Sequence, residues 1–183
     1  VDAARKQPGR LIECERFMRF DGKVAVVTGG ASGIGRAASE ILAARGASVS
    51  LIDVSPDAGN ETIKSIHSRN GKAVFFSVDV SQTQQLQEAI NETRTTFGPI
   101  DILVVSAGIQ RYGNALTTDE DQWAEVMGVN LNGARYAAKF CLPDMVRRGG
   151  SIVNVASVQS LASQYNVLAY TVSKHALIGL RGA

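Results

Sequence analysis

The sequence of 183 residues has little of several features, and each scarcity argues against a class of protein. Its two cysteines, Cys14 and Cys141, are far apart and match no zinc spacing, so no metal site is expected and a reducing, cytoplasmic location is favoured. Its net charge is only +2, and its basic residues are scattered, which gives no argument for a nucleic-acid partner. Its longest apolar runs have the length of a strand, so no membrane span is expected.

The first twenty residues also lack an apolar stretch of the kind that defines a secretory signal. They contain Asp2, Glu13 and Glu15, and such acidic residues argue against a transit peptide. We therefore expect residues 1–20 to form a flexible N-terminal arm. Because 45% of the sequence is apolar, residues 21–183 can fill the core of a single domain.

What the sequence does contain is a glycine-rich stretch at residues 24–35, reading V-A-V-V-T-G-G-A-S-G-I-G. Four apolar residues predict a buried strand, four glycines within seven positions predict a tight turn, and helical spacing follows. The free amide groups and the dipole at the start of a helix attract a pyrophosphate. The stretch therefore predicts a dinucleotide site, although a glycine-rich turn without a ligand has the same local pattern.

Strand and helix patterns alternate five times along the rest of the chain. The predicted strands are near-continuously apolar, which is typical of a parallel sheet covered on both faces. We therefore predict an α/β fold with a doubly wound parallel sheet, the Rossmann fold, in which ligands bind at the carboxyl ends of the strands. The strands are expected at 24–27, 48–52, 73–78, 102–105 and 151–155, and the helices at about 35–45, 56–68, 81–97 (with Ser81 as its N-cap), 119–148 (bent or ended near Pro143) and 165 or 168 to the end.

Asp53 follows the second predicted strand, 18 residues after Gly35. A carboxylate there can accept hydrogen bonds from the ribose of a bound adenosine, and it would repel a 2′-phosphate. The loop carries Ser32 rather than a basic residue, and Val54 follows Asp53, so both neighbours favour NAD over NADP. The alternative is a solvated loop carboxylate.

Tyr170 and Lys174 are four residues apart in a predicted helix and therefore share one face. A lysine ammonium beside a phenol stabilises the phenolate, which suits the tyrosine to proton transfer near neutral pH. Ser157 follows the fifth strand, where its hydroxyl could hold a substrate oxygen. In isolation, the pair is equally typical of a surface tyrosine beside a solvated lysine.

Taken in order, these motifs resemble those of the short-chain dehydrogenase/reductase family, from about Phe20 to the last residue. The residues that carry the resemblance are 28–35 (T-G-G-A-S-G-I-G), Asp53, 79–80 (D-V), Asn130, Ser157 and 170–174 (Y-T-V-S-K). The resemblance implies that Tyr170 is the catalytic acid/base and that Lys174 assists it and binds the nicotinamide ribose. It further implies that Ser157 orients the substrate and that Asn130 holds a water in the proton relay, with a backbone-satisfied helix kink as the alternative for Asn130.

The resemblance also implies the residues that bind the cofactor, NAD. Asp79 and Val80 would flank the adenine, although Asp79 could instead cap a helix. The full set of implied cofactor-binding residues is Gly29, Ser32, Gly33, Ile34, Gly35, Asp53, Asp79, Val80, Ser106, Ala107, Gly108, Tyr170 and Lys174.

The sequence departs from the family pattern in two places. Residues 105–108 read V-S-A-G where the family has Asn-Asn-Ala-Gly, so we expect some loss of local stability and little effect on cofactor choice. The sequence also ends at Ala183, nine residues after Lys174 and well before family members end. We therefore expect the last strands of the family fold and much of the substrate pocket to be missing, with the fifth strand left as an exposed edge.

The expected activity is hydride transfer between NAD and a small secondary alcohol or ketone, with a sugar or polyol among the candidates. The alternatives are an enzyme like the 3-oxoacyl carrier-protein reductases, which usually favour NADP, and a dinucleotide-binding protein without turnover. Gln159 could hydrogen-bond a substrate hydroxyl or stabilise its own loop. The family resemblance also implies a homo-oligomer, either a dimer or a tetramer.

Overall fold

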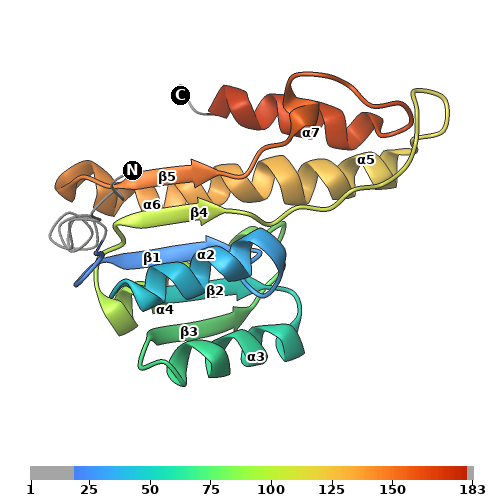
Figure 1. Cartoon of the computed structure of the whole chain (residues 1–183). Coiled ribbons are helices and arrows are strands. Elements are labelled where there is room, and N and C mark those ends of the chain that lie inside the picture. The colour runs from blue at the N-terminus through green and yellow to red at the C-terminus, as the bar shows by residue number, and fades with distance from the viewer. Residues whose placement is uncertain (1–18, 181–183) are drawn as a thin grey trace, which may run out of the picture.

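A five-stranded parallel sheet lies between two layers of helices in the computed structural model, which describes residues 19–180 (Figure 1). The predicted arm therefore lies outside the described residues except for its last two. The strands are β1 (Val24–Thr28), β2 (Ser48–Asp53), β3 (Lys72–Ser77), β4 (Ile102–Val105) and β5 (Ser151–Asn154). The helices are α2 (Gly33–Ala44), α3 (Pro56–His67), α4 (Thr83–Phe97), α5 (Glu120–Met127), α6 (Ala134–Arg148) and α7 (Leu168–Gly179). The predicted doubly wound fold is confirmed.

Strand β1 is buried on both faces, which explains its uninterrupted apolar sequence. Val24 and Val26 point into the core formed with α4 and α6, whereas Ala25 and Val27 point into the core formed with α2 and α3. The alternation follows from the two-residue period of a strand. The sheet is thus held between two separate hydrophobic cores.

The strand order, β3-β2-β1-β4-β5, reverses direction between β1 and β4. The chain first adds strands on one side of β1 and then continues on its other side. Ligands of doubly wound sheets bind at such a switch point, outside the carboxyl ends of the strands. The glycine turn after β1 and the loop at 106–108 after β4 flank this point. At the far side of the sheet, β5 is an edge strand, as predicted, and Val153 on it is 52% exposed.

The predicted helical region is confirmed over 120–148, although its middle, η1 (Gly128–Gly133), is a π-helix. The helix does not end at Pro143, which lies inside α6. The wider turn of a π-helix takes up an extra residue, and such turns often mark functional sites. Ser81 is also not an N-cap, because α4 begins at Thr83 and the Ser81 amide donates to the Asp79 carboxylate at 2.9 Å.

An ion pair joins α4 and α6 at the amino end of β4. The Arg94 Nε lies 2.7 Å from the Asp144 Oδ2, and Arg94 also donates to the Phe140 carbonyl. The Ile100 amide donates to the same carboxylate at 3.2 Å. Burial alone would raise the pKa of Asp144, but the hydrogen bonds from Arg94 and Ile100 outweigh it and hold that pKa below its ordinary value.

We expect Asp144→Asn to lower the free energy of unfolding by about 1.5 kcal/mol at about pH 7. Because the folded pKa of Asp144 lies below the unfolded one, its contribution is complete above the ordinary value and is lost as the pH falls through the folded value. Urea unfolding at about pH 7 and about pH 3 measures both ends of this window. The difference from wild type should shrink at the acid end, whereas the exposed Glu92→Gln control should show little difference at either pH. A deficit that is unchanged in acid would contradict the assignment.

Candidate active site at the carboxyl ends of the strands

A cleft of about 910 Å³ opens where the strands of the switch point end. Twelve of the thirteen predicted cofactor-binding residues line it, and the exception is Gly35. They are Gly29, Ser32, Gly33, Ile34, Asp53, Asp79, Val80, Ser106, Ala107, Gly108, Tyr170 and Lys174. Tertiary structure therefore brings the glycine turn, three strand ends and helix α7 to one cavity.

The glycine turn is shaped for close contact on one side and for open space on the other. Gly29 has a φ of +66°, and a Cβ at this position would lie 2.7 Å from the Ala107 nitrogen. Gly33 also has a positive φ, of +50°, yet a Cβ there would meet nothing within 4 Å. A Cβ on Gly35 would overlap the Gly29 carbonyl oxygen, so Gly35 allows α2 to pack against the turn and does not line the cleft.

Asp53 is held at the cleft by two backbone amides. Its Oδ2 accepts from Ala31 in the glycine turn at 3.0 Å, and its Oδ1 accepts from Ser55 at 3.1 Å. The carboxylate is half-buried rather than fully solvated. Each oxygen retains a lone pair for a further donor. Asp53 thus fixes the conformation of the glycine turn and presents an acceptor at its rim.

The loop after β4 is anchored from two directions. The Thr28 Oγ1 accepts from the amides of Ser106 and Ala107 at 3.2 and 3.4 Å. Asn130, in the π-helix, accepts from the Ile109 amide at 2.8 Å and donates to the Ile109 carbonyl at 2.9 Å. These contacts hold residues 106–108 in place, which form one wall of the cleft and belong to the stretch that departs from the family pattern.

The Asn130 side chain is only 1% exposed and makes a third contact, because Nδ2 donates to the Ser173 Oγ at 3.0 Å. Ser173 in turn donates to the Tyr170 carbonyl at 2.7 Å. Asn130 therefore links the wall of the cleft to α7. The water-holding role that the family resemblance implies for Asn130 stays a prediction.

Tyr170 and Lys174 both line the cleft from α7. The Lys174 Nζ lies 5.7 Å from the centroid of the Tyr170 ring and donates to the Val155 carbonyl at 2.9 Å. Lys174 is 4% exposed, and this burial lowers the pKa of its ammonium group. The surface alternative for this pair is therefore wrong, because Lys174 is buried and faces the cleft.

Ser157 does not line the cleft as the described residues form it. It precedes a 3₁₀ turn, η2 (Val158–Ser160), and its Oγ accepts from the Gln159 amide at 3.2 Å. The Ser160 Oγ accepts from the Ser157 amide at the same distance, which completes a capping box. The structure therefore places Ser157 at the turn after β5, and its predicted role in orienting a substrate stays a prediction.

The sequence analysis missed an ion pair on the rim of the cleft. Arg111 donates from Nε and Nη2 to the two carboxylate oxygens of Glu125, at 2.9 and 2.5 Å. Both residues line the cleft. They lie 14 positions apart in a loop and a helix, so no local periodicity relates them. It also missed Val155, whose carbonyl binds Lys174, because a backbone acceptor leaves no signal in a sequence.

Residues 19–180 contain neither a membrane-spanning helix nor a cluster of metal-binding side chains. No helix in this part of the chain is long and apolar enough to cross a membrane. Within the same residues, no three or more His, Cys, Asp or Glu side chains lie together in a way that could hold a metal ion.

A doubly wound parallel sheet with a glycine turn at its switch point defines a nucleotide-binding α/β protein. Comparison with known proteins gives the family. Residues 23–183 match the family model of the short chain dehydrogenases, so the chain belongs to this family of oxidoreductases.

Individual relatives agree with this family. An uncharacterized oxidoreductase of Thermotoga maritima is 41% identical over 164 residues, which are 89% of this chain and 64% of the relative. The meso-2,3-butanediol dehydrogenase of Serratia marcescens is 36% identical over 166 residues, 91% of this chain and 65% of the relative. The crystal structure of carveol dehydrogenase from Mycobacterium avium in complex with NAD matches with a TM-score of 0.85 and 30% identity, over 88% of this chain and 64% of that one. The chain thus spans less than two thirds of the length of each.

Proposed function

We propose that this protein transfers hydride between NAD and a small secondary alcohol or ketone, with Tyr170 as the acid/base. The observation that carries the proposal is the meeting of the glycine turn, Asp53 and the Tyr170–Lys174 pair in one cleft. The first two suit a dinucleotide, whereas a lysine beside a tyrosine suits proton transfer. The combination is best explained by proton transfer next to a nicotinamide.

The shape of the cleft fits NAD. Gly33 begins α2, and the open space where its Cβ would lie gives a pyrophosphate access to the first amides of the helix. Asp53 offers acceptors for ribose hydroxyls and would repel a 2′-phosphate. Asp79 and Val80, which follow β3 and line the same cleft, are proposed to flank the adenine. A bound nicotinamide would supply the hydride chemistry that no side chain can provide.

The residues of α7 supply the proton chemistry in this proposal. In the oxidation direction, Tyr170 acts as the phenolate and takes the proton from a substrate alcohol. In the reverse direction, the protonated phenol returns that proton to the ketone oxygen. Lys174 has three donors, of which the Val155 carbonyl uses one, so donors remain for a ribose hydroxyl and for the proton path. Ser157 is proposed to hold the substrate oxygen, and Asn130 to complete the relay behind Lys174.

The substrate class is proposed from the relatives. One relative is named for a diol, meso-2,3-butanediol, and one solved structure for carveol. Both names support an alcohol as substrate, and sugars and polyols are the natural extension of the diol. Another relative is a 3-oxoacyl-[acyl-carrier-protein] reductase of Thermotoga maritima, which is 35% identical over 164 residues. Reduction of a 3-oxoacyl thioester is therefore the alternative activity.

The test is a binding titration followed by turnover assays with the full-length natural protein. NADH fluorescence measures binding, and NADH absorbance measures turnover with a panel of secondary alcohols, diols, sugars and a 3-oxoacyl thioester. Reduction of NAD⁺ by members of the alcohol panel supports the proposal. Binding without turnover anywhere in the panel would instead favour a dinucleotide-binding protein, and activity confined to the thioester with NADPH would favour the reductase.

Asp53→Asn tests the proposed choice of cofactor. Removing the charge should raise the affinity for NADPH relative to NADH by about tenfold or more, because a repulsion between like charges is removed. Dissociation constants for both cofactors measure the ratio. Asp79→Asn is the matched control, since it removes a carboxylate of the same cleft at a different strand end and should leave the ratio unchanged. An unchanged ratio in Asp53→Asn would contradict the proposed role.

A homo-oligomer, either a dimer or a tetramer, is part of the same proposal. The helices α5, α6 and α7 carry apolar side chains that are partly exposed, which supports burial between subunits. They are Trp123, Leu142, Val146 and Ile178. Sedimentation velocity of the full-length natural protein decides the matter, and a monomer at micromolar concentration would contradict it.

A further inference from the structure

Gln159 lies at the centre of a buried polar contact between three segments. Its side-chain Oε1 accepts from the Thr171 Oγ1 at 2.9 Å, and its Nε2 donates to the Gln164 Oε1 at 2.6 Å. Its backbone amide donates to the Ser157 Oγ at 3.2 Å. The residue is 8% exposed. One residue thus connects the Ser157 hydroxyl, the loop at 161–167 and the residue that follows Tyr170.

The contact with Thr171 completes a clamp on the first turn of α7. Two residues further along α7, Asn130 donates to Ser173, and Ser173 donates to the Tyr170 carbonyl. Thr171 and Ser173 are both buried, at 7% and 0% exposure. Two of the three residues that follow Tyr170 in the helix are therefore each anchored to another segment. The anchor at Thr171 is Gln159.

The arrangement also decides between the two roles that the sequence leaves open for Gln159. Both ends of its amide are used within the protein, and Gln159 does not line the cleft. A buried amide with its acceptor and a donor satisfied has little to offer a substrate, and breaking these bonds would cost the desolvation of both partners. The loop-stabilising role is thus the one its contacts support.

We propose that Gln159 is a positioning residue that holds the Ser157 hydroxyl and the Tyr170 side chain in one reactive geometry. The inference rests on the proposed function of Tyr170 and Ser157. A small displacement of Tyr170 or Ser157 is enough to lower activity, because a misplacement of about 1 Å can cost about 100-fold in rate. Gln159 acts through the two residues and touches neither substrate nor cofactor.

The variants are chosen to remove the hydrogen bonds without opening a cavity. Gln159→Met keeps the length of the side chain, and Thr171→Val removes the same contact from the α7 side. Each should lower kcat by about 30-fold while KM and the dissociation constant of NADH change by less than about twofold. The double variant should lose no more than Gln159→Met alone, because that substitution already removes the hydrogen bond that Thr171→Val removes. Gln84→Met, an exposed glutamine of α4, is the matched control and should keep wild-type kcat.

A second measurement does not depend on turnover. Amide hydrogen exchange of residues 168–172 should become faster in Gln159→Met and Thr171→Val to the same extent, with no further gain in the double variant. If wild type turns over no substrate, the dehydrogenase proposal fails, and the exchange measurement still decides whether Gln159 holds α7. Equal exchange in wild type and both variants overturns the positioning role.

Three kinetic outcomes also overturn it. A rise in KM with unchanged kcat would make Gln159 a substrate ligand. Additive losses in the double variant would mean that Gln159 and Thr171 act separately. A parallel loss of kcat, substrate affinity and NADH affinity, together with a lower melting temperature, would reduce Gln159 to a general contributor to stability.

Discussion

Tyr170→Phe should lower kcat by about 1,000-fold while NADH binding remains close to that of wild type. The substitution removes only the hydroxyl that would exchange a proton with substrate, and a positioned acid/base contributes about 100- to 10,000-fold. The ring remains available for packing and for the Lys174 ammonium group, which lies 5.7 Å from its centroid. The measurement is initial rate by NADH absorbance, with NADH fluorescence titration on the same samples.

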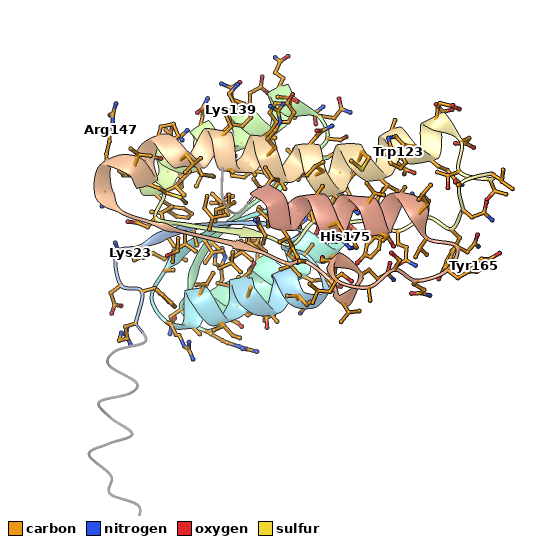
Figure 2. The ribbon with its side chains drawn as sticks, turned by 90° about the horizontal axis from the view of Figure 1, so that it is seen from above. Lys23, Trp123, Lys139, Arg147, Tyr165 and His175 are labelled. Carbon is orange, nitrogen blue, oxygen red and sulfur yellow. The ribbon has the colours of Figure 1, made fainter. Side chains whose placement is uncertain are left out.

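Tyr165→Phe is the matched control for this prediction. Tyr165 lies on the loop that leads into α7, is 85% exposed and does not line the cleft (Figure 2). Loss of its hydroxyl should leave kcat and NADH affinity unchanged. Wild-type turnover in Tyr170→Phe would refute the proposed acid/base, and an equal loss in both variants would show that the assay reports something other than proton transfer in the cleft.

Gly29→Ala should weaken NADH binding by about 100-fold and lower the free energy of unfolding by about 3 kcal/mol. Two costs add at this position. A side chain in the left-handed region costs about 1–2 kcal/mol, and the new Cβ would lie 2.7 Å from the Ala107 nitrogen and 2.8 Å from its Cα. These are backbone atoms held by Thr28, so relief requires the loop at 106–108 to move. That loop is one wall of the proposed cofactor site.

Gly22→Ala separates strain from displacement. Gly22 has a φ of +72°, yet its Cβ would meet nothing within 4 Å, and it does not line the cleft. Its substitution should cost about 1 kcal/mol of stability through strain alone and leave NADH affinity intact. Urea unfolding and NADH titration test both variants. If Gly29→Ala binds NADH as Gly22→Ala does, the contact between the glycine turn and the 106–108 loop has no part in cofactor binding.

Local patterns in the sequence were sufficient for the fold class and for most of the cleft. The apolar run before the glycines predicts β1, because a strand buried on both faces needs an unbroken apolar sequence. The four-residue spacing of Tyr170 and Lys174 predicts a shared helix face, because helical geometry depends only on neighbouring residues. Alternation of strands and helices then places the strand-end residues, Asp53 among them, at one edge of a parallel sheet.

Local patterns were insufficient wherever packing between distant segments decides the outcome. Pro143 is a helix breaker by its local chemistry, yet α6 passes through it and the helix changes at Gly128–Gly133 instead. Gly35 belongs to the glycine motif, but its lack of a side chain accommodates the Gly29 carbonyl rather than a ligand. The ion pair of Arg111 and Glu125 joins a loop to a helix without any periodic relation.

The identity of this chain as a short-chain dehydrogenase therefore follows from residues whose order along the chain is informative, since each motif forms within a single turn or helix. The hydrogen bonds that anchor the start of α7 do not follow from any such local motif. Gln159, Asn130 and Thr171 come from three segments, and their hydrogen bonds exist only because the sheet and helices bring these segments together. A sequence records which donors and acceptors are present, whereas tertiary packing decides which of them lose water and must pair with one another.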